Sequence, residues 1–267
     1  LAQAIAAAQA ADVVVAVVGD TLALIGEARS TATLELFGAQ NALLEALAAT
    51  GKPMILVLLA SKPQVLPPAA MGAAAIINAF NPGMRGGQAL AELIFGLIEP
   101  SGRLPVTFAR HAGQLPVFYN QLNGQHGHRY ADLTQDPLFA FGEGLSYTTV
   151  TYTGLELLQS EYRQGDTVRA RITLRNTGLR PALETVQIYV RDVVSSVTWA
   201  VKELKAYRQV RVQPGEQVVV DLELPVAACS LVNAKGQRVV EAGEFDLLVG
   251  RSSRSRDLMA ARFSVLG

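Results

Sequence analysis

The sequence predicts two domains of different fold class, an α/β sandwich with a mostly parallel sheet over residues 1–152 and an all-β sandwich over residues 153–267. Up to about residue 152, short apolar runs alternate with helical stretches rich in Ala and Leu. Strands and helices that alternate over short links indicate a parallel sheet. Beyond that point the chain holds only short alternating segments between turn residues, which is the pattern of a β-sandwich.

The first domain is expected to contain four strands around one parallel sheet and, besides a helix at its start that is described below, two further helices. Val13–Gly19 (VVVAVVG) is a continuous apolar run, typical of a strand buried on both faces of a sheet. The other expected strands are Met54–Ala60, Ala73–Phe80 and Leu104–Phe108, and the expected helices are Leu36–Thr50 and Gly86–Gly96. Helices therefore cover the sheet on both faces in this prediction.

The sequence of the second domain predicts evenly spaced short strands. Alternating segments are expected at Val168–Leu174, Thr185–Val190, Val218–Leu224 and Phe245–Val249. Turn residues such as Asn176-Thr177-Gly178 and Gln213-Pro214-Gly215 separate them. Because no helical period of useful length occurs, we expect a sandwich of immunoglobulin or fibronectin III topology.

A long connection of mixed character runs from about Arg110 to Val150. It exceeds ordinary loop lengths, so we expect packing or function to order it. It holds His111, His126 and His128, which have only an HxH pair in a Gly-flanked loop, so no metal site is expected. Its aromatic residues are expected to serve core and domain packing rather than sugar binding: Tyr119, Tyr130, Phe139, Phe141 and Tyr147.

Composition excludes several classes of protein. The chain has 23 basic and 23 acidic residues and no block of like charge, so no nucleic-acid surface is expected. Half of the residues are apolar, which argues against disorder. No apolar run reaches the ~18 residues of a membrane span. Gly19 and Gly26 do not form a GxGxxG motif, and this argues against a dinucleotide-binding domain.

The start of the chain and its single cysteine bear on processing. LAQAIAAAQA lacks a basic leader and is interpreted as a helix that runs into a buried strand, so we expect that sequence once preceded it. Cys229 has no partner within the chain, which is compatible with cytoplasm, periplasm or secretion. Of these we favour a periplasmic or secreted protein.

Five segments together carry a recognisable order of motifs. Asn81–Gly96 reads NPGMRGGQALAELIFG, Glu99–Phe108 reads EPSGRLPVTF and Pro137–Tyr147 reads PLFAFGEGLSY. VQIYVRD with VKEL, and PGE with AGEF, follow between residues 186 and 245. In this order they resemble the C-terminal part of glycoside hydrolase family 3, with its PGxEGGxAxAxxLFG, NPSGRLPVTFP and PLxPFGYGLSYT patterns. Arg85, Ala109 and Glu143 depart from these patterns and leave the substrate preference open.

The resemblance implies that a further domain, which this sequence does not contain, supplies part of the active site. Family members usually have an N-terminal (β/α)8-type barrel, then an α/β sandwich, then often a fibronectin III-like domain. The barrel holds the nucleophilic aspartate and most of the sugar pocket, and this chain has no GFxGFVxSDW-like stretch. We therefore expect a barrel domain as partner, in the same precursor or as a separate subunit.

The acid/base that the resemblance implies is Glu27. The segment Asp20–Leu34 (DTLALIGEARSTATL) follows the first expected strand, where residues face the ligand crevice of a parallel sheet. The family carries its acid/base in this loop, in patterns like GExxxxxHEASSRT, and residues 27–30 (EARS) resemble HEASSR. A retaining glycosidase needs two carboxyl groups ~5–5.5 Å apart and no cofactor.

Several neighbours of Glu27 are given roles as well. An acid that keeps its proton needs an apolar surrounding, which Leu22, Leu24 and Ile25 are expected to supply. Arg29 is the candidate substrate-binding residue, with pairing to a nearby acid as its alternative. The remaining interpretations are that Glu35 serves the N-terminus of the helix expected at Leu36, that Asp20 caps a turn, and that Trp199 anchors the β-domain on the α/β domain or reaches the active-site rim.

The resemblance implies hydrolysis of terminal non-reducing β-D-glucosyl residues, with a glycoside as substrate and neither nucleic acid nor membrane as partner. Other activities of the family stay open as alternatives: β-xylosidase, N-acetylglucosaminidase or phosphorylase. A non-catalytic carbohydrate-binding or interaction module is the alternative from a different class.

Overall fold

The computed structural model describes residues 1–122, 124 and 130–267, and its chain forms two compact units. Unit 1 comprises Leu1–Leu97 and Phe108–Pro116, and unit 2 comprises Ile98–Thr107 and Val117–Gly267. Residues 98–107 and the described part of 117–152 thus group with the β-sandwich and not with the parallel sheet. The limits 1–152 and 153–267, which concern folding domains, stay a prediction.

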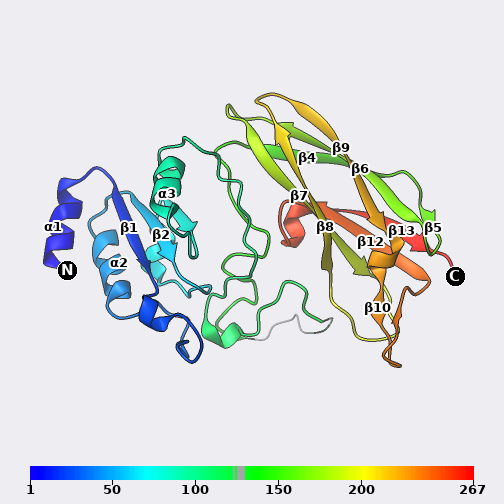
Figure 1. The fold of residues 1–267 in the computed structure, drawn as a ribbon, viewed down its shortest axis with the longest axis horizontal. Coiled ribbons are helices and arrows are strands. Elements are labelled where there is room, and N and C mark those ends of the chain that lie inside the picture. The colour runs from blue at the N-terminus through cyan, green and yellow to red at the C-terminus, as the bar shows by residue number, and fades with distance from the viewer. Residues whose placement is uncertain (123, 125–129) are drawn as a thin grey trace. The chain divides into compact units, whose positions relative to one another are not determined.

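Unit 1 is built on a parallel sheet with the strand order β1-β2-β3 (Figure 1). Its strands are in register, with Val17 beside Val57 and Val57 beside Ile77. Its elements are α1 (Ala2–Ala10), β1 (Val14–Gly19), η1 (Leu22–Leu24), α2 (Gln40–Ala48), β2 (Met54–Leu59), η2 (Pro68–Gly72), β3 (Ala75–Asn78), α3 (Gly86–Ile94) and η3 (Ala112–Gln114). This confirms the parallel α/β arrangement predicted from the alternation of strands and helices.

The helix expected from Leu36 begins later, at Gln40. Gly38 has φ +66°, a left-handed conformation that interrupts a right-handed helix and that glycine adopts without strain. From Gln40 onward Leu44 and Leu47 are buried, as the helical spacing predicted. The prediction of a helix N-terminus directly after Glu35 was therefore wrong.

Strand β1 is covered on one face only within the described residues. Ala16 and Val18 are buried, whereas Val15 and Val17 are 48% and 54% exposed. Helix α2 packs against β1, and β1 is an edge strand of its sheet. The prediction of burial on both faces was wrong for this strand, because an apolar run does not reveal whether a strand is central or at an edge.

The segment Leu104–Phe108 forms no regular strand, contrary to the prediction. Pro105 has no backbone N–H and cannot complete a strand ladder. Leu104 instead makes two backbone hydrogen bonds inside unit 2: its N–H donates to the Glu143 carbonyl at 2.9 Å, and its carbonyl accepts from Gly142 N at 2.7 Å. Residues 104–107 therefore belong to unit 2 with the β-sandwich, whereas Phe108 belongs to unit 1.

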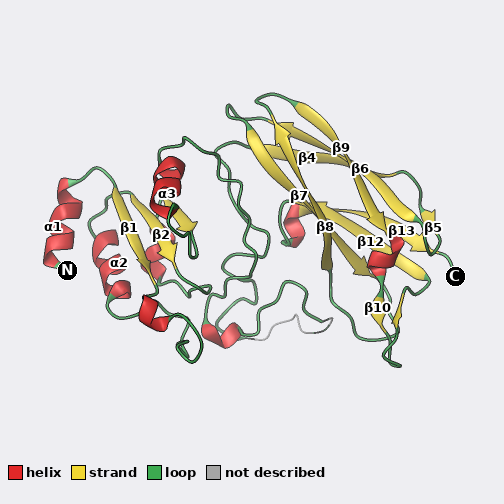
Figure 2. Cartoon of the chain, in the orientation of Figure 1, coloured by secondary structure: helices red, strands yellow, loops and turns green. Residues whose placement is uncertain are grey.

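Unit 2 is a sandwich of a five-stranded and a three-stranded sheet, with a small hairpin beside them (Figure 2). The strand orders are β5-β13-β12-β7-β8 and β4-β6-β9. The strands are β4 (Val150–Leu157), β5 (Glu161–Tyr162), β6 (Thr167–Asn176), β7 (Ala182–Asp192), β8 (Glu203–Val212), β9 (Gln217–Pro225), β10 (Leu231–Val232), β11 (Arg238–Val239), β12 (Gly243–Gly250) and β13 (Leu258–Val265), with short helical turns η4 (Val226–Cys229) and η5 (Ser255–Asp257). Alternate residues such as Ile172, Leu222 and Leu247 fill the core, as predicted.

Packing orders the described part of the long connection, which confirms that expectation. The Tyr119 ring stacks on Phe141 with centroids 4.2 Å apart and meets Tyr189 edge-on at 5.8 Å. The Tyr119 hydroxyl accepts a hydrogen bond from Leu204 N at 3.1 Å. Tyr119 and Phe141 thus act as packing residues of unit 2, as predicted.

Glu143, which stands where the family has an aromatic residue, has a structural partner. Its carboxylate accepts from Ala140 N at 2.7 Å and from Arg254 Nε at 2.8 Å. Arg254 also donates to the Leu138 carbonyl at 2.9 Å. An ion pair therefore holds the turn of the PLFAFGEGLSY segment at the position that differs from the family pattern.

A carboxylate between two arginines makes the stability of unit 2 depend on pH. Asp246 of β12 is flanked in register by Arg191 and Arg262, and both Nε atoms donate to it at 2.8 Å. Burial alone would raise the pKa of Asp246, but the hydrogen bonds and charges of Arg262 and Arg191 more than offset this and hold it below its usual value. The folded state therefore binds protons less readily than the unfolded state.

The stabilisation by Asp246 is present above the pKa of the unfolded carboxyl, near 4, and is lost as pH falls through the lower folded pKa. We expect Asp246→Asn to cost about 1–2 kcal/mol at neutral pH and much less well below pH ~4. Urea unfolding at several pH values measures this. Equal costs at both ends of the pH range would contradict the assignment.

Candidate active-site loop

Three loops leave the carboxyl ends of the parallel strands in unit 1 and meet at one edge of the sheet. They are residues 20–39 after β1, 60–67 after β2 and 79–85 after β3. Asp20 Oδ2 accepts from Ser61 N at 3.1 Å, and Asn81 donates to Ser61 Oγ at 3.1 Å. Ligands of open α/β sheets bind at this edge, so these loops form the candidate site.

The first of these loops has a rigid start. Gly19 has φ +142°, and an added Cβ would lie 1.9 Å from the Leu59 carbonyl oxygen, so the position requires glycine. The Gln40 amide accepts from Gly19 N at 2.6 Å and donates to the Gly19 carbonyl at 2.8 Å. Asp20 also accepts from Gln64 Nε2 at 3.2 Å, so its carboxylate joins this loop to the loop after β2, and its predicted role in capping a turn stays a prediction.

Glu27 lies in an exposed tight turn of this loop. Arg29 N donates to the Gly26 carbonyl at 3.3 Å, so Glu27 and Ala28 occupy the centre of the turn. Ala28 has φ +59°, a left-handed conformation that costs a non-glycine residue about 1–2 kcal/mol. The turn therefore presents the Glu27 side chain to solvent at the carboxyl edge of the sheet, where the resemblance places an acid/base.

The predicted apolar surrounding of Glu27 is not supplied by its sequence neighbours. Leu22 is 87% exposed, and Leu24 and Ile25 are half-buried. The Glu27 carboxylate makes no hydrogen bond or ion pair with any residue that the structure describes. Arg29 is exposed beside it, and its predicted contact with substrate stays a prediction.

Glu35 does not lie at the N-terminus of a helix, contrary to the prediction. It forms an isolated parallel bridge with Val65 and lies well before the first residue of α2. Its backbone N–H donates to the Thr33 hydroxyl at 3.1 Å. The residue therefore belongs to the support of the loop through its backbone.

The other candidates have contacts of their own or lie outside the described residues. His111 Nδ1 accepts from Gly113 N at 3.0 Å and caps the short helix η3, while His126 and His128 lie outside the described residues. The Trp199 indole donates to Glu203 Oε2 at 2.9 Å within unit 2. Its predicted contact with the α/β domain stays a prediction.

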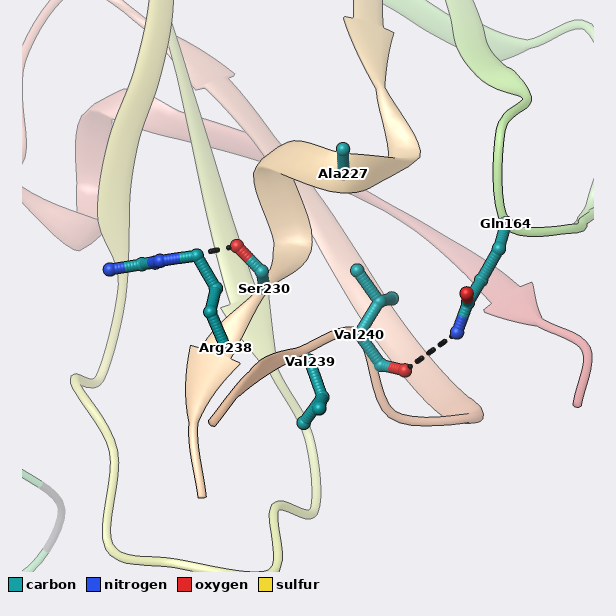
Figure 3. A pocket seen from close by; sticks show the side chains of 6 residues that line it. All are labelled: Gln164, Ala227, Ser230, Arg238, Val239 and Val240. Carbon is teal, nitrogen blue, oxygen red and sulfur yellow. Dashed lines mark hydrogen bonds between the residues drawn. The ribbon is translucent and has the colours of Figure 1, made fainter. Parts of the chain in front are cut away.

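A hollow of about 330 Å³ on unit 2 is not suited to this chemistry (Figure 3). Gln164 donates to the Val240 carbonyl at 3.1 Å, and Arg238 to Ser230 Oγ at 3.4 Å, so its polar groups pair with one another. Its lining has no carboxylate. Among the residues of described position, no cluster of three metal-ligating side chains occurs, and none of the helices reaches the length and hydrophobicity of a membrane span.

Comparison with known proteins identifies the family. The model of the glycosyl hydrolase family 3 C-terminal domain matches residues 1–147. The chain belongs to glycosyl hydrolase family 3. A second model, the fibronectin type III-like domain, matches residues 184–253 of this family 3 chain and confirms the fold class predicted for the β-sandwich.

Individual relatives of the family 3 chain are glycosidases by name. The periplasmic β-glucosidase of Salmonella typhimurium is 36% identical over 94% of this chain, and a β-xylosidase of Formosa agariphila is 37% identical over 98%. Among solved structures, a β-glucosidase of saponin metabolism from intestinal bacteria is 53% identical, with a TM-score of 0.95 over 99% of the chain. A glucose complex of a Listeria innocua β-glucosidase is 32% identical, with a TM-score of 0.91 over 98% of the chain.

The family 3 chain is much shorter than these relatives. It spans 34% and 37% of the two curated enzymes and 38% of each of the two solved chains.

Proposed function

We propose that this chain is the C-terminal part of a retaining, exo-acting β-glycosidase that acts on terminal non-reducing β-D-glucosyl residues. Glu27 supplies the acid/base, and an aspartate on a barrel domain outside this chain supplies the nucleophile. The observation that carries the proposal is the exposed Glu27 turn at the carboxyl edge of the sheet, in a chain 53% identical to a β-glucosidase structure. The substrate is a small glycoside or oligosaccharide.

The proposed reaction has two balanced steps. In the first, the nucleophile bonds to the anomeric carbon, the glycosidic C–O bond breaks, and Glu27 gives its proton to the departing oxygen. In the second, the Glu27 carboxylate takes a proton from water as the water oxygen bonds to the anomeric carbon and the nucleophile departs. The barrel then holds the sugar ring, and this chain provides proton transfer.

β-Xylosidase activity is the second candidate, because the Formosa agariphila relative is named a β-xylosidase and is 37% identical. The two sugars differ by the hydroxymethyl group of glucose, which the barrel pocket would recognise. We further propose a periplasmic or exported location, since the Salmonella relative is named periplasmic.

We expect the chain alone to leave nitrophenyl β-D-glucoside intact and a protein that joins it to a family 3 barrel to hydrolyse it with net retention of anomeric configuration. A single carboxylate cannot carry out the double displacement. Product configuration by NMR and initial rates on the matching xyloside measure the outcome and the sugar preference. Turnover by the chain alone would overturn the proposal, since the nucleophile would then lie within these residues.

A further inference from the structure

The loop after β2 supports the Glu27 loop along its length. At the start of the Glu27 loop, Asp20 accepts from Ser61 N and Gln64 Nε2. In its second half, the Lys62 ammonium donates to Thr31 Oγ1. At its end, Val65 N donates to the Leu34 carbonyl at 2.8 Å. A segment of only five residues, 61–65, thus holds the start, the second half and the end of the loop.

Lys62 makes the only side-chain contact of this support that reaches the second half of the loop, among the described residues. The Thr31 hydroxyl that accepts from Lys62 donates in turn to the Thr33 carbonyl at 2.8 Å. Thr33 Oγ1 accepts from Glu35 N at 3.1 Å. The Lys62 contact and these two local bonds together restrain residues 31–35, directly after the Glu27 turn. Lys62 is half-buried, so its ammonium is less free to leave than an exposed one.

The Glu27 turn itself contains no comparable restraint. One backbone hydrogen bond closes it, and Glu27 forms no side-chain contact with the described residues. Its position relative to the sheet therefore depends on how firmly the two flanks of the loop are held. Asp20 and Gln64 hold the first flank, and Lys62 with Thr31 holds the second.

We infer that Lys62 is a positioning residue for the proposed acid/base: by holding Thr31 it fixes the loop that presents Glu27 to the glycosidic oxygen. The inference rests on the proposed function. Proton transfer needs the donor within hydrogen-bond reach of its acceptor, and a displacement of about 1 Å can cost about 100-fold in rate. Lys62 acts through Thr31 and does not contact the substrate.

The test compares two substrates in the barrel-containing protein. An alkyl β-glucoside requires protonation of its leaving group, whereas a dinitrophenyl β-glucoside requires almost none. We expect Lys62→Met to lower kcat/KM for the alkyl glucoside about 10- to 100-fold and to leave kcat/KM for the dinitrophenyl glucoside within about 3-fold. Thr31→Val should show the same selective loss, and Lys62→Arg should retain most of the activity because it keeps a donor.

Lys52→Met is the matched control. Lys52 is also half-buried in unit 1 but lies before β2, at the opposite end of the strand from Lys62. We expect Lys52→Met to leave kcat/KM unchanged for both substrates. Thermal unfolding of each variant separates loss of fold from loss of positioning, and Thr31→Val answers the question if Lys62→Met fails to fold.

The outcomes separate this inference from the proposed function. Equal losses on both substrates, or no loss, with Lys62→Met and Thr31→Val would overturn the inference while Glu27→Gln still discriminates between the substrates. If Glu27→Gln itself fails to discriminate, the proposed function falls and the inference with it. A selective loss that the Lys62→Met/Thr31→Val double variant does not increase would support action through one contact.

Discussion

Replacing Glu27 by glutamine in the barrel-containing protein is expected to lower turnover of alkyl β-glucosides by about 10²- to 10⁴-fold. The amide of glutamine keeps the size of the side chain but can neither protonate the leaving oxygen nor take a proton from water. The dinitrophenyl glucoside still forms the glycosyl-enzyme, because its leaving group departs without a proton. Its hydrolysis should then show a rapid burst of dinitrophenol followed by slow turnover.

Azide provides an independent check on the role of Glu27. Azide attacks the anomeric carbon without the help of a base, so it should restore turnover of the dinitrophenyl glucoside by Glu27→Ala and yield β-glucosyl azide. Glu35→Gln is the matched control, since Glu35 follows in the same loop and contributes to its support through its backbone. Full turnover of alkyl glucosides by Glu27→Gln would exclude it as the acid/base.

The largest effect on stability is expected at Glu184. Its side chain is 5% exposed and pairs with Arg103 Nη2 at 3.1 Å, while Tyr152 donates its hydroxyl at 2.7 Å. Burial and then the charge of Glu184 raise the pKa of Tyr152, so the phenol stays a donor. Glu184→Ala leaves the Arg103 guanidinium buried, at 9% exposure, without its carboxylate. We expect a loss of about 3–5 kcal/mol in the free energy of unfolding.

Two further variants show whether this loss comes from an uncompensated charge. Arg103→Met combined with Glu184→Leu and Tyr152→Phe should recover much of it, because these apolar replacements remove both charges and also the hydroxyl that donates to Glu184. Asp221→Asn breaks the exposed pair with Arg171 and should cost far less, because solvent screens both charges. Urea unfolding followed through Trp199, the single tryptophan of the chain, reports on unit 2. Similar costs for Glu184→Ala and Asp221→Asn would contradict the argument.

The fold class could be predicted from local sequence because each unit has one consistent pattern of apolar residues. Unit 1 alternates apolar strand runs with helices, and the strands of unit 2 alternate apolar and polar residues. Alternate residues of β6 and β9 are buried, as a half-buried strand requires, and apolar runs gave β2 and β3 correctly. The errors arose where a distant partner decides the outcome. The apolar run in β1 did not reveal that this strand lies at an edge, and the GRLP segment is held by Glu143 and Glu184, which lie far along the chain.

The candidate site likewise contains one residue that the sequence predicts and others that only the structure shows. The motif and the position after the first strand predict Glu27 as the acid/base, and its role stays a prediction. Lys62 and Gln64 were not singled out, since they act on residues 31 and 44 positions away. Gln64 stands in the mixed segment SKPQVLPP, which carries no sequence signal for it, and only the structure shows that its side chain is buried. Contacts between the loop after β2 and the Glu27 loop become visible only when the fold brings both loops to the same edge of the sheet.

The Arg103–Glu184 pair also limits how this β-sandwich can be moved between proteins. A hybrid enzyme joined at residue 153 would receive Glu184 without Arg103 and Tyr152, and its carboxylate would be buried alone unless the host supplied both partners. The SGRLP segment therefore has to be transferred together with the sandwich, although residues 106–149 separate it from β4. Gene fusions within the family are expected to succeed when the junction precedes Ile98 and to yield unstable proteins when it falls after Tyr152.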